Sequence, residues 1–141
     1  KEAFDQKKAK LDFEIIGVDI SSKNFKIAKE NISNAGLNNE IRIFNKSFEE
    51  FTPPSAPGTI IINPPYGERM EMPESLYKNI GDNLKKKYQD YQAWVLSCNL
   101  EAVKSVGLKP SRRIPIMNSQ LDCRFINYSM YSGTKKIKPI S

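Results

Sequence analysis

Residues 60–68 read Ile-Ile-Ile-Asn-Pro-Pro-Tyr-Gly-Glu, an abrupt change from apolar to proline-rich sequence. Three isoleucines in a row favour a strand, and an uninterrupted apolar run predicts burial on both faces, as in a parallel sheet covered by helices. Pro64 and Pro65 have no backbone N–H to donate to a neighbouring strand, so regular structure must stop there. The strand therefore ends either in a plain turn or at a place where backbone groups are left free to bind a ligand.

The composition suits one soluble globular unit: 141 residues, 39% hydrophobic and 27% charged. No stretch approaches the length of a membrane span, and we expect no membrane partner. The chain has no histidine, and Cys98 and Cys123 lie far apart without metal-ligand spacing. A zinc site and a histidine-based catalytic triad are therefore not expected, nor any other metal site.

Charge and cysteine content give weaker indications. The formal net charge of +6 favours an anionic partner such as nucleic acid, although a lysine-rich solvated surface is the simpler explanation of charge alone. Two cysteines without a pairing signal are typical of a reduced, cytoplasmic protein, and we expect that localisation.

Strands and helices alternate along the chain. Short apolar runs typical of strands are separated by segments whose apolar residues recur with helical spacing. Ser21 or Ser22 can cap the first helix, and Gly36 suits its end. The predicted strands are residues 13–18, 41–44, 59–62 and 91–97, and the predicted helices are residues 22–35, 76–88 and 100–106.

The end of the chain follows another pattern. Residues 112–117 and 122–131 have the composition of two strands, joined by a turn at residues 118–120, and this predicts an antiparallel hairpin. Repeated strand–helix units closed by a hairpin predict an α/β, doubly wound sheet that is mostly parallel. No repeat, low-complexity tract or linker indicates a second domain.

Ligands of such sheets bind beyond the carboxyl ends of the strands. Asp19 lies there, between the first predicted strand and the first predicted helix. A carboxylate at that position can accept hydrogen bonds from both hydroxyls of a ribose. An isolated Asp more often serves only as a cap or turn residue, so Asp19 by itself is a weak signal.

The second polar cluster is Asn63-Pro64-Pro65-Tyr66. Asn63 precedes a proline and is pushed toward extended geometry. Its side-chain oxygen and the Pro64 carbonyl can then present two rigid acceptors beside the flat face of Tyr66. These groups complement a planar ring that carries an amino group, which supplies two donors. The alternative is a Pro-Pro turn with a packed tyrosine. The position directly after an apolar strand, with Asn63 in front, favours a binding site.

Asn63-Pro64-Pro65-Tyr66 resembles the catalytic motif of Rossmann-like, S-adenosylmethionine-dependent methyltransferases that act on adenine N6, guanine N2 or a protein glutamine amide. Longer segments specify the family more closely. They are residues 63–69, residues 107–118 and Leu121-Asp122-Cys123-Arg124-Phe125. Together they resemble the bacterial 23S ribosomal RNA guanine-N2 methyltransferases, which carry a THUMP RNA-binding domain before the catalytic domain. The resemblance extends over nearly the whole chain.

The resemblance implies S-adenosylmethionine as the cofactor and large-subunit (23S) ribosomal RNA as the partner. Asp19 would bind the cofactor ribose, and Ile20 would pack near the adenine. Ser47 and Phe48 stand where the family usually contacts the adenine ring. An Asp is common at the position of Ser47, and a serine can make only a weaker version of its contact with the adenine amino group.

The same resemblance implies that residues 63–66 hold the target amine and that Asn63 also contacts the cofactor. A nucleobase amine is a poor nucleophile because its lone pair is delocalised into the ring, and two acceptors on its hydrogens favour a pyramidal nitrogen. Catalysis would then rely on positioning, with Tyr66 as a stacking surface for the unstacked base. Candidate phosphate contacts, each with surface solvation or carboxylate pairing as the alternative, are Arg69, Arg112 and Arg113.

The family's first strand and the glycine-rich loop after it do not occur in this sequence. We therefore expect residues 1–141 to be the C-terminal portion of a single methyltransferase catalytic domain, in a longer chain with a THUMP-type domain in its N-terminal remainder. Without the central strand, the two halves of the sheet would expose edges and apolar surface. Expressed alone, this portion is expected to be poorly soluble or partly unfolded, to bind no cofactor and to be inactive.

Two other classes of function stay open. One is a methyltransferase with a non-RNA substrate, either DNA adenine N6 or a protein glutamine. The other is a non-catalytic RNA-binding module that keeps the fold, although the intact Asn63 and Tyr66 argue against it.

Overall fold

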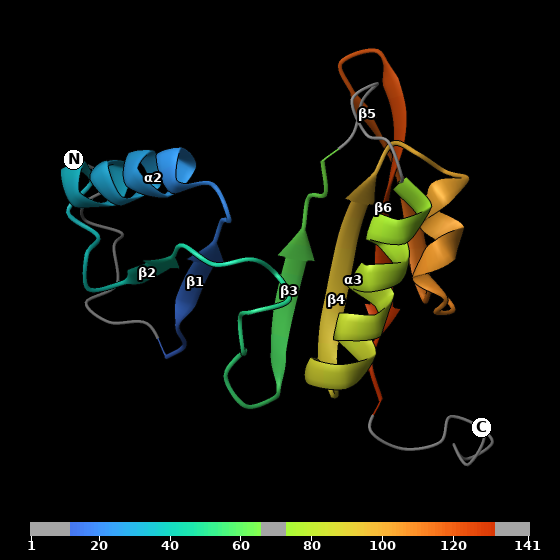
Figure 1. Ribbon diagram of the computed structural model, residues 1–141, viewed down its shortest axis with the longest axis horizontal. Coiled ribbons are helices and arrows are strands. Elements are labelled where there is room, and N and C mark those ends of the chain that lie inside the picture. Colours follow the sequence, from blue (N-terminus) through green and yellow to red (C-terminus); the bar gives the residue numbers. More distant parts are fainter. Residues whose placement is uncertain (1–11, 66–72, 132–141) are drawn as a thin grey trace. The chain divides into compact units, whose positions relative to one another are not determined.

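The computed structural model describes residues 12–65 and 73–131, and they form two compact units that are treated separately below. Unit 1 ends at Phe51 and unit 2 begins at Thr52. The elements of unit 1 are β1 (Ile15–Val18), α2 (Ser22–Asn34) and β2 (Ile41–Phe44). Those of unit 2 are β3 (Gly58–Ile62), α3 (Pro73–Lys87), β4 (Tyr91–Ser97), the 3-10 helix η1 (Ala102–Val106), β5 (Arg112–Asn118) and β6 (Leu121–Ser129) (Figure 1).

Unit 1 is a strand–helix–strand unit. β1 and β2 pair in parallel, from Ile15 opposite Ile41 to Val18 opposite Phe44, and α2 connects them. Ser21 caps the helix, because its Oγ accepts a hydrogen bond from the Asn24 N–H at 3.1 Å. This confirms the predicted helix 22–35 to within one residue, and it confirms that Ser21 can cap the start of the helix.

Unit 2 is built on a four-stranded sheet in the order β3-β4-β6-β5. β3 runs parallel to β4, whereas β6 is antiparallel to both β4 and β5, which confirms the predicted C-terminal hairpin. α3 and η1 pack against each other, and Tyr77 of α3 reaches Ser97 of β4. The core is mainly apolar and includes Tyr77, Ile80, Leu84, Tyr88, Ala93, Val95, Val106, Ile126 and Tyr128.

The expectation that the isoleucine strand is buried on both faces is wrong. Ile61 is 68% exposed, and Ile60 and Ile62 are only half-buried. β3 is an edge strand of its sheet. The Tyr77–Ser97 contact places α3 on the face of the sheet that carries Val95, whose partner in β3 is Ile62. Ile61 points to the opposite face, because successive side chains alternate along a strand.

The expectation of two reduced cysteines is also wrong. Cys98 and Cys123 form a disulfide, with their Cα atoms 4.0 Å apart. The strand register is the reason, because Ser97 of β4 pairs with Arg124 of β6 and the next positions along the two strands are these cysteines. Their separation of 25 residues in the sequence concealed that they are neighbours.

The hairpin turn is shorter than predicted. β5 and β6 stay paired as far as Asn118 opposite Leu121, so the turn consists of Ser119 and Gln120 alone. Ser119 has φ of 59°, a left-handed conformation that suits a two-residue hairpin turn. Among the helices that the structure describes, none has the length and apolar character needed to cross a membrane.

Gly81 should be essential to the packing of α3 on η1. A Cβ atom at this position would lie 1.8 Å from the carbonyl oxygen of Val106, and backbone cannot give way cheaply. Gly81→Ala should therefore lower the free energy of unfolding by about 1–3 kcal/mol. Chemical denaturation measures this value, with Ser75→Ala on the exposed side of the same helix as the control. If both variants unfold like the unsubstituted protein, this account of the packing is incorrect.

Candidate active site

Asp19 follows β1 directly and continues its pairing with β2. The Asp19 N–H donates to the Phe44 carbonyl at 3.1 Å, and one carboxylate oxygen, Oδ1, accepts from the Ser21 N–H at 2.8 Å. The bond to Ser21 turns the chain into α2 and fixes the orientation of the carboxylate. A carboxylate has capacity for several hydrogen bonds, so the turn role and a ligand role are compatible.

Asn45, a residue that the sequence analysis did not single out, holds this loop in place. Its Nδ2 donates to the carbonyl oxygens of Asp19 and Ile20 at 3.0 and 3.2 Å, and its Oδ1 accepts from the Ser22 hydroxyl at 3.1 Å. Asn45 follows β2 as Asp19 follows β1, so the two loops meet at one edge of the sheet. The feature of the sequence that could have identified Asn45 is its position as a polar residue directly after the second strand.

The other predicted cofactor residues of unit 1 lie in these two loops. Ile20 is 72% exposed, which leaves an apolar side chain beside the Asp19 carboxylate. Ser47 closes a turn with Glu50: its N–H donates to the Glu50 carboxylate at 3.1 Å, and its Oγ accepts from the Glu50 N–H at 3.1 Å. The hydrogen bond from the Ser47 backbone N–H is the largest cause of a lowered pKa of Glu50, and the Ser47 side chain also lowers it. Ser47 is therefore engaged as a turn cap, and Phe48 beside it is half-buried.

In unit 2, Asn63, Pro64 and Pro65 follow the carboxyl end of β3. The side chain of Pro64 is buried, whereas Asn63 and Pro65 are exposed. The buried ring anchors the segment, and the exposed Asn63 amide is available to a ligand. Tyr66 and Arg69 lie outside the described residues.

A buried polar cluster lies at the same edge of this sheet. The Tyr77 and Ser97 hydroxyls are 2.7 Å apart, and Ser97 Oγ accepts from the Asn99 N–H at 3.1 Å. Both Tyr77 and Ser97 are almost fully buried. Ile62 of β3 pairs with Val95 of β4. Pro64 and Ser97 each lie two residues beyond that pair, so they are at the same level on neighbouring segments. This cluster, which the sequence did not reveal, stiffens the strand next to Asn63 and Pro64.

Two of the residues predicted to contact phosphate lie on the β5–β6 hairpin. Arg112 and Arg113 are exposed at the start of β5, the end opposite to the hairpin turn. Burial raises the pKa of Tyr128 to about 12, and the positive charge of Arg113 opposes the shift. Arg113 is thus close enough to Tyr128 to act on it.

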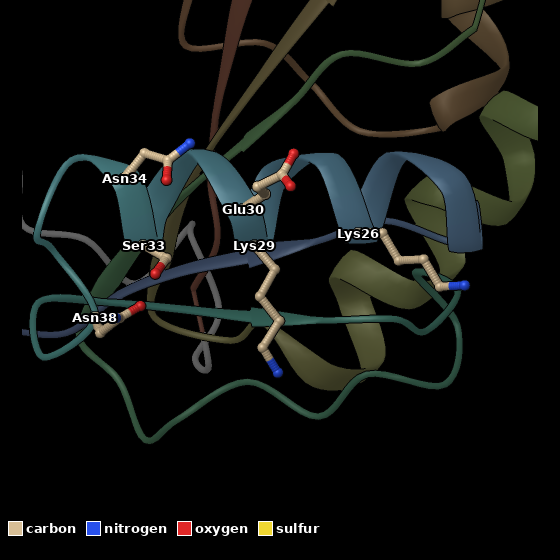
Figure 2. A pocket seen from close by; sticks show the side chains of 6 residues that line it. All are labelled: Lys26, Lys29, Glu30, Ser33, Asn34 and Asn38. Atoms are coloured by element: carbon tan, nitrogen blue, oxygen red, sulfur yellow. The ribbon is translucent and has the colours of Figure 1, made fainter.

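In unit 1, a hollow of about 480 Å³ lies on the surface of α2 (Figure 2). Lys26 and Lys29 extend from the helix on one side, and Asn38 lies in the connection that enters β2 at its amino end. Asp19 lies at the carboxyl end of the paired strand, so the hollow is not part of the predicted site. All six lining residues are exposed: Lys26, Lys29, Glu30, Ser33, Asn34 and Asn38. Within residues 12–65 and 73–131, no cluster of three or more His, Cys, Asp or Glu could hold a metal ion.

A family model described as RMKL-like, methyltransferase domain, matches residues 1–127. The chain belongs to this family. Its membership confirms the resemblance to large-subunit ribosomal RNA methyltransferases seen in the motifs, whereas the THUMP domain stays a prediction.

Known relatives agree with this assignment. The protein slr0064 of Synechocystis sp., provisionally named as an RNA methyltransferase, is 36% identical over 118 residues, which are 82% of this chain and 31% of slr0064. Ribosomal RNA large subunit methyltransferase K/L of Shewanella loihica is 32% identical over 134 residues, 92% of this chain and 19% of the relative. The chain thus spans less than a third of either relative.

The fold also has a close counterpart among solved structures. The crystal structure of SMU.472 complexed with SAH (S-adenosylhomocysteine) superposes with a TM-score of 0.83, at 21% identity, over 94% of this chain and 36% of that one. This similarity confirms the predicted α/β, Rossmann-like fold, with parallel pairs followed by a C-terminal antiparallel hairpin.

Asn45→Ala should loosen the loops that carry Asp19 and Ser47. The substitution removes two bonds to the carbonyls of Asp19 and Ile20, so the free energy of unfolding of the unit should fall by about 1–2 kcal/mol. Amide hydrogen exchange at Ser21, read by NMR, should become faster. Asn38→Ala, exposed at the other end of β2, is the control and should leave that amide unchanged. Unchanged exchange in Asn45→Ala would show that Asn45 does not hold the loop.

Proposed function

We propose that this chain is part of an S-adenosylmethionine-dependent methyltransferase that modifies the exocyclic amino group of a nucleobase in RNA, with guanine N2 of large-subunit (23S) ribosomal RNA as the target. The observation that carries the proposal is the segment after β3. There an exposed Asn63 and the carbonyl of a buried Pro64 stand at the carboxyl end of a strand, in a chain that belongs to a methyltransferase family.

The relatives support the class of substrate. One is named as a ribosomal RNA large subunit methyltransferase, and another carries a provisional RNA methyltransferase name. The net charge of +6 suits a polyanionic substrate. The disulfide removes the argument from reduced cysteines for a cytoplasmic protein, and the assignment to the cytoplasm now rests on the proposed ribosomal RNA substrate alone. The resemblance adds that the remainder of the longer chain would bring a THUMP-type RNA-binding domain.

The residues of unit 1 fit the nucleoside part of the cofactor. Asp19 presents a carboxylate whose orientation is fixed by Ser21 and whose loop is fixed by Asn45, and this suits a pair of ribose hydroxyls. The exposed Ile20 offers an apolar contact for the adenine ring. Ser47 and Phe48 complete the proposed set in unit 1, and the family resemblance alone adds Asn63 as a further cofactor contact. Support from a solved structure is that SMU.472, which shares the fold, was crystallised with SAH.

When bound, S-adenosylmethionine supplies an electrophilic methyl group on a sulfonium. The chain's task is to present the amine to that group. Asn63 Oδ1 and the Pro64 carbonyl would each accept one amino hydrogen, which favours a pyramidal nitrogen with its lone pair directed outward. Asn63 and Pro64 would hold the nitrogen where it can take up the methyl group that the cofactor would supply, and the methylated amine would release one proton to solvent. Positioning of this kind requires no histidine, and the chain has none.

Two alternatives have distinct signatures. A methyltransferase acting on DNA adenine N6 or on a protein glutamine would use the same acceptors but would transfer methyl to those substrates in a parallel assay. A non-catalytic RNA-binding module would bind RNA without binding S-adenosylmethionine, a difference that calorimetry on the full-length protein measures.

Asp19→Ala should weaken binding of S-adenosylmethionine. A hydrogen bond to a charged group contributes about 1.5–3 kcal/mol, so loss of one such bond should raise Kd by about 10- to 150-fold in calorimetry. Asp19→Asn keeps an oxygen to accept from Ser21 and should bind more tightly than Asp19→Ala. Asp12→Ala, exposed in the same unit, is the control. Unchanged affinity of Asp19→Ala would remove this residue from the cofactor site.

Asn63→Ala tests the chemical role directly. Loss of one preorganised acceptor should lower the single-turnover rate of methylation by about 10²–10³-fold and leave RNA affinity nearly unchanged. Tyr66→Phe keeps a stacking face and should be mild, whereas Tyr66→Ala should lose about 1–3 kcal/mol of base stacking. A thermal melt of each variant is the control. If Asn63→Ala is destabilised but its folded fraction methylates RNA at the unchanged rate, the segment after β3 serves only as a turn.

A further inference from the structure

The carboxyl end of β4 carries a buried hydroxyl that makes three hydrogen bonds. Ser97 Oγ accepts from the Asn99 N–H at 3.1 Å, donates to the Asn99 carbonyl at 3.2 Å and lies 2.7 Å from the Tyr77 hydroxyl. A serine hydroxyl has one proton, and here the Asn99 carbonyl takes it. Tyr77 is therefore the donor in its bond to Ser97, and this bond joins α3 to the end of β4 (Figure 1).

Asn99 continues this cluster into the next element. Its Oδ1 accepts from the Ala102 N–H at 2.9 Å, where η1 begins. Tyr77 and Ser97 are only 2% and 1% exposed, and in the part of the chain that the structure describes every buried side-chain nitrogen or oxygen has a hydrogen-bond partner. A bond lost from so buried a cluster leaves a polar atom without solvent to replace its partner. The cluster thus holds α3, the end of β4 and the start of η1 at one spacing.

The segment after β3 lies beside this cluster. Along residues 61–65 the side chains are in turn exposed, half-buried, exposed, buried and exposed. This period of two is typical of extended backbone, so the faces continue to alternate beyond Ile62, the last residue of β3. Ile62 pairs with Val95 on the face of the sheet that α3 covers. Pro64 and Ser97, each two residues further on, therefore lie on that same face.

The two proposed acceptors are thereby linked to the cluster. Pro64 is buried on the face that carries Ser97, so its ring and carbonyl are held by the packing of that face. Asn63 precedes Pro64 directly and points to the opposite, exposed face. A proline has a fixed φ and restricts the backbone of the residue before it, so Asn63 has little freedom of its own. A change in the spacing of α3 and β4 would therefore displace both acceptors.

We propose that Tyr77 is a positioning residue for methyl transfer, whose bond to Ser97 fixes the spacing that places the Asn63 and Pro64 oxygens against the target amine. The inference rests on the proposed function. The buried Tyr77 hydroxyl acts through Ser97 and does not itself touch the substrate. A misplacement of about 1 Å can lower an enzymatic rate by about 10²-fold, and loss of one hydrogen bond permits a smaller shift, so a fall of about tenfold is expected.

A purely structural hydroxyl would behave differently, and Tyr91 supplies the matched comparison. Tyr91 is 6% exposed, and its hydroxyl donates to the Pro54 carbonyl at 2.5 Å. It is the first residue of β4, about 20 Å along the strand from Ser97. Tyr91→Phe and Tyr77→Phe each remove one buried hydroxyl and one hydrogen bond and keep the aromatic ring. Only Tyr77→Phe does so beside the proposed acceptors.

Single-turnover methylation of unmodified 23S ribosomal RNA by the full-length protein, at saturating S-adenosylmethionine, tests the proposal. Tyr77→Phe should lower the maximal rate by about tenfold and change the RNA concentration at half-maximal rate by less than about twofold. Tyr91→Phe should leave both values unchanged, although the melting temperatures of the two variants should fall by similar amounts. Ser97→Thr, which keeps the hydroxyl, should retain the rate to within about twofold, whereas Ser97→Ala should lower it at least as much as Tyr77→Phe does.

A double variant shows whether the two hydroxyls act as a pair. Tyr77→Phe combined with Ser97→Ala should be no slower than Ser97→Ala alone, because both substitutions remove the same bond. Losses that multiply in the double variant would overturn the proposal. So would a Tyr77→Phe protein whose folded fraction is as fast as Tyr91→Phe, or one in which only the affinity for RNA changes. An unsubstituted protein that methylates no RNA would instead remove the proposed function itself.

Discussion

The parallel pairing of β3 with β4 is the constraint on which the candidate site in unit 2 depends. It brings the end of the isoleucine strand to the edge where β4 ends and the β5–β6 hairpin projects. Pro64 and Pro65 then stop the strand at that edge, because neither can continue the pairing. A shift of one residue in this register would turn Asn63 to the opposite face of the sheet. The chemistry assigned to Asn63 therefore depends on backbone pairing several residues away from it.

Support for the two acceptor loops comes from uncharged side chains with specific partners. In unit 1, Asn45 bonds to the carbonyls of Asp19 and Ile20 in the loop after β1, and the Ser47 hydroxyl accepts from the Glu50 N–H in the turn after β2. In unit 2, the buried Tyr77–Ser97 pair occupies the end of β4. Hydrogen bonds of this kind restrict loops without adding charge near the proposed sulfonium and amine, and they are consistent with catalysis by positioning.

Local signals were sufficient for much of the fold. Helical spacing and the Ser21 cap located α2, and turn residues separated the strands of the hairpin. What failed depended on long-range pairing. Ile61 is exposed because its side chain points to the face of the sheet opposite α3, and the Cys98–Cys123 disulfide follows from the register of β4 and β6. Neither the position of a strand in its sheet nor its register is encoded within the strand itself.

The candidate site was predictable only where a residue is proposed to bind a ligand by itself. Asp19 and Asn63 follow apolar strands and carry oxygen acceptors, and this position marks them in the sequence. Asn45 and Ser97 act through neighbours that are distant in the sequence, so their roles required coordinates. Ser47 illustrates the reverse case: the motif suggested an adenine contact, whereas the structure shows a turn cap whose ligand role stays a proposal.

The central claim is that Asn63 and Pro64 present two acceptors to an exocyclic amino group. Identification of the methylated nucleoside tests it most directly. Unmodified 23S ribosomal RNA, incubated with the full-length protein and isotopically labelled S-adenosylmethionine, would be digested to nucleosides and analysed by mass spectrometry. The account predicts label on N2-methylguanosine. Label on a ring nitrogen, a ring carbon or a ribose oxygen would contradict it, because none of these atoms carries two hydrogens for the two acceptors to hold.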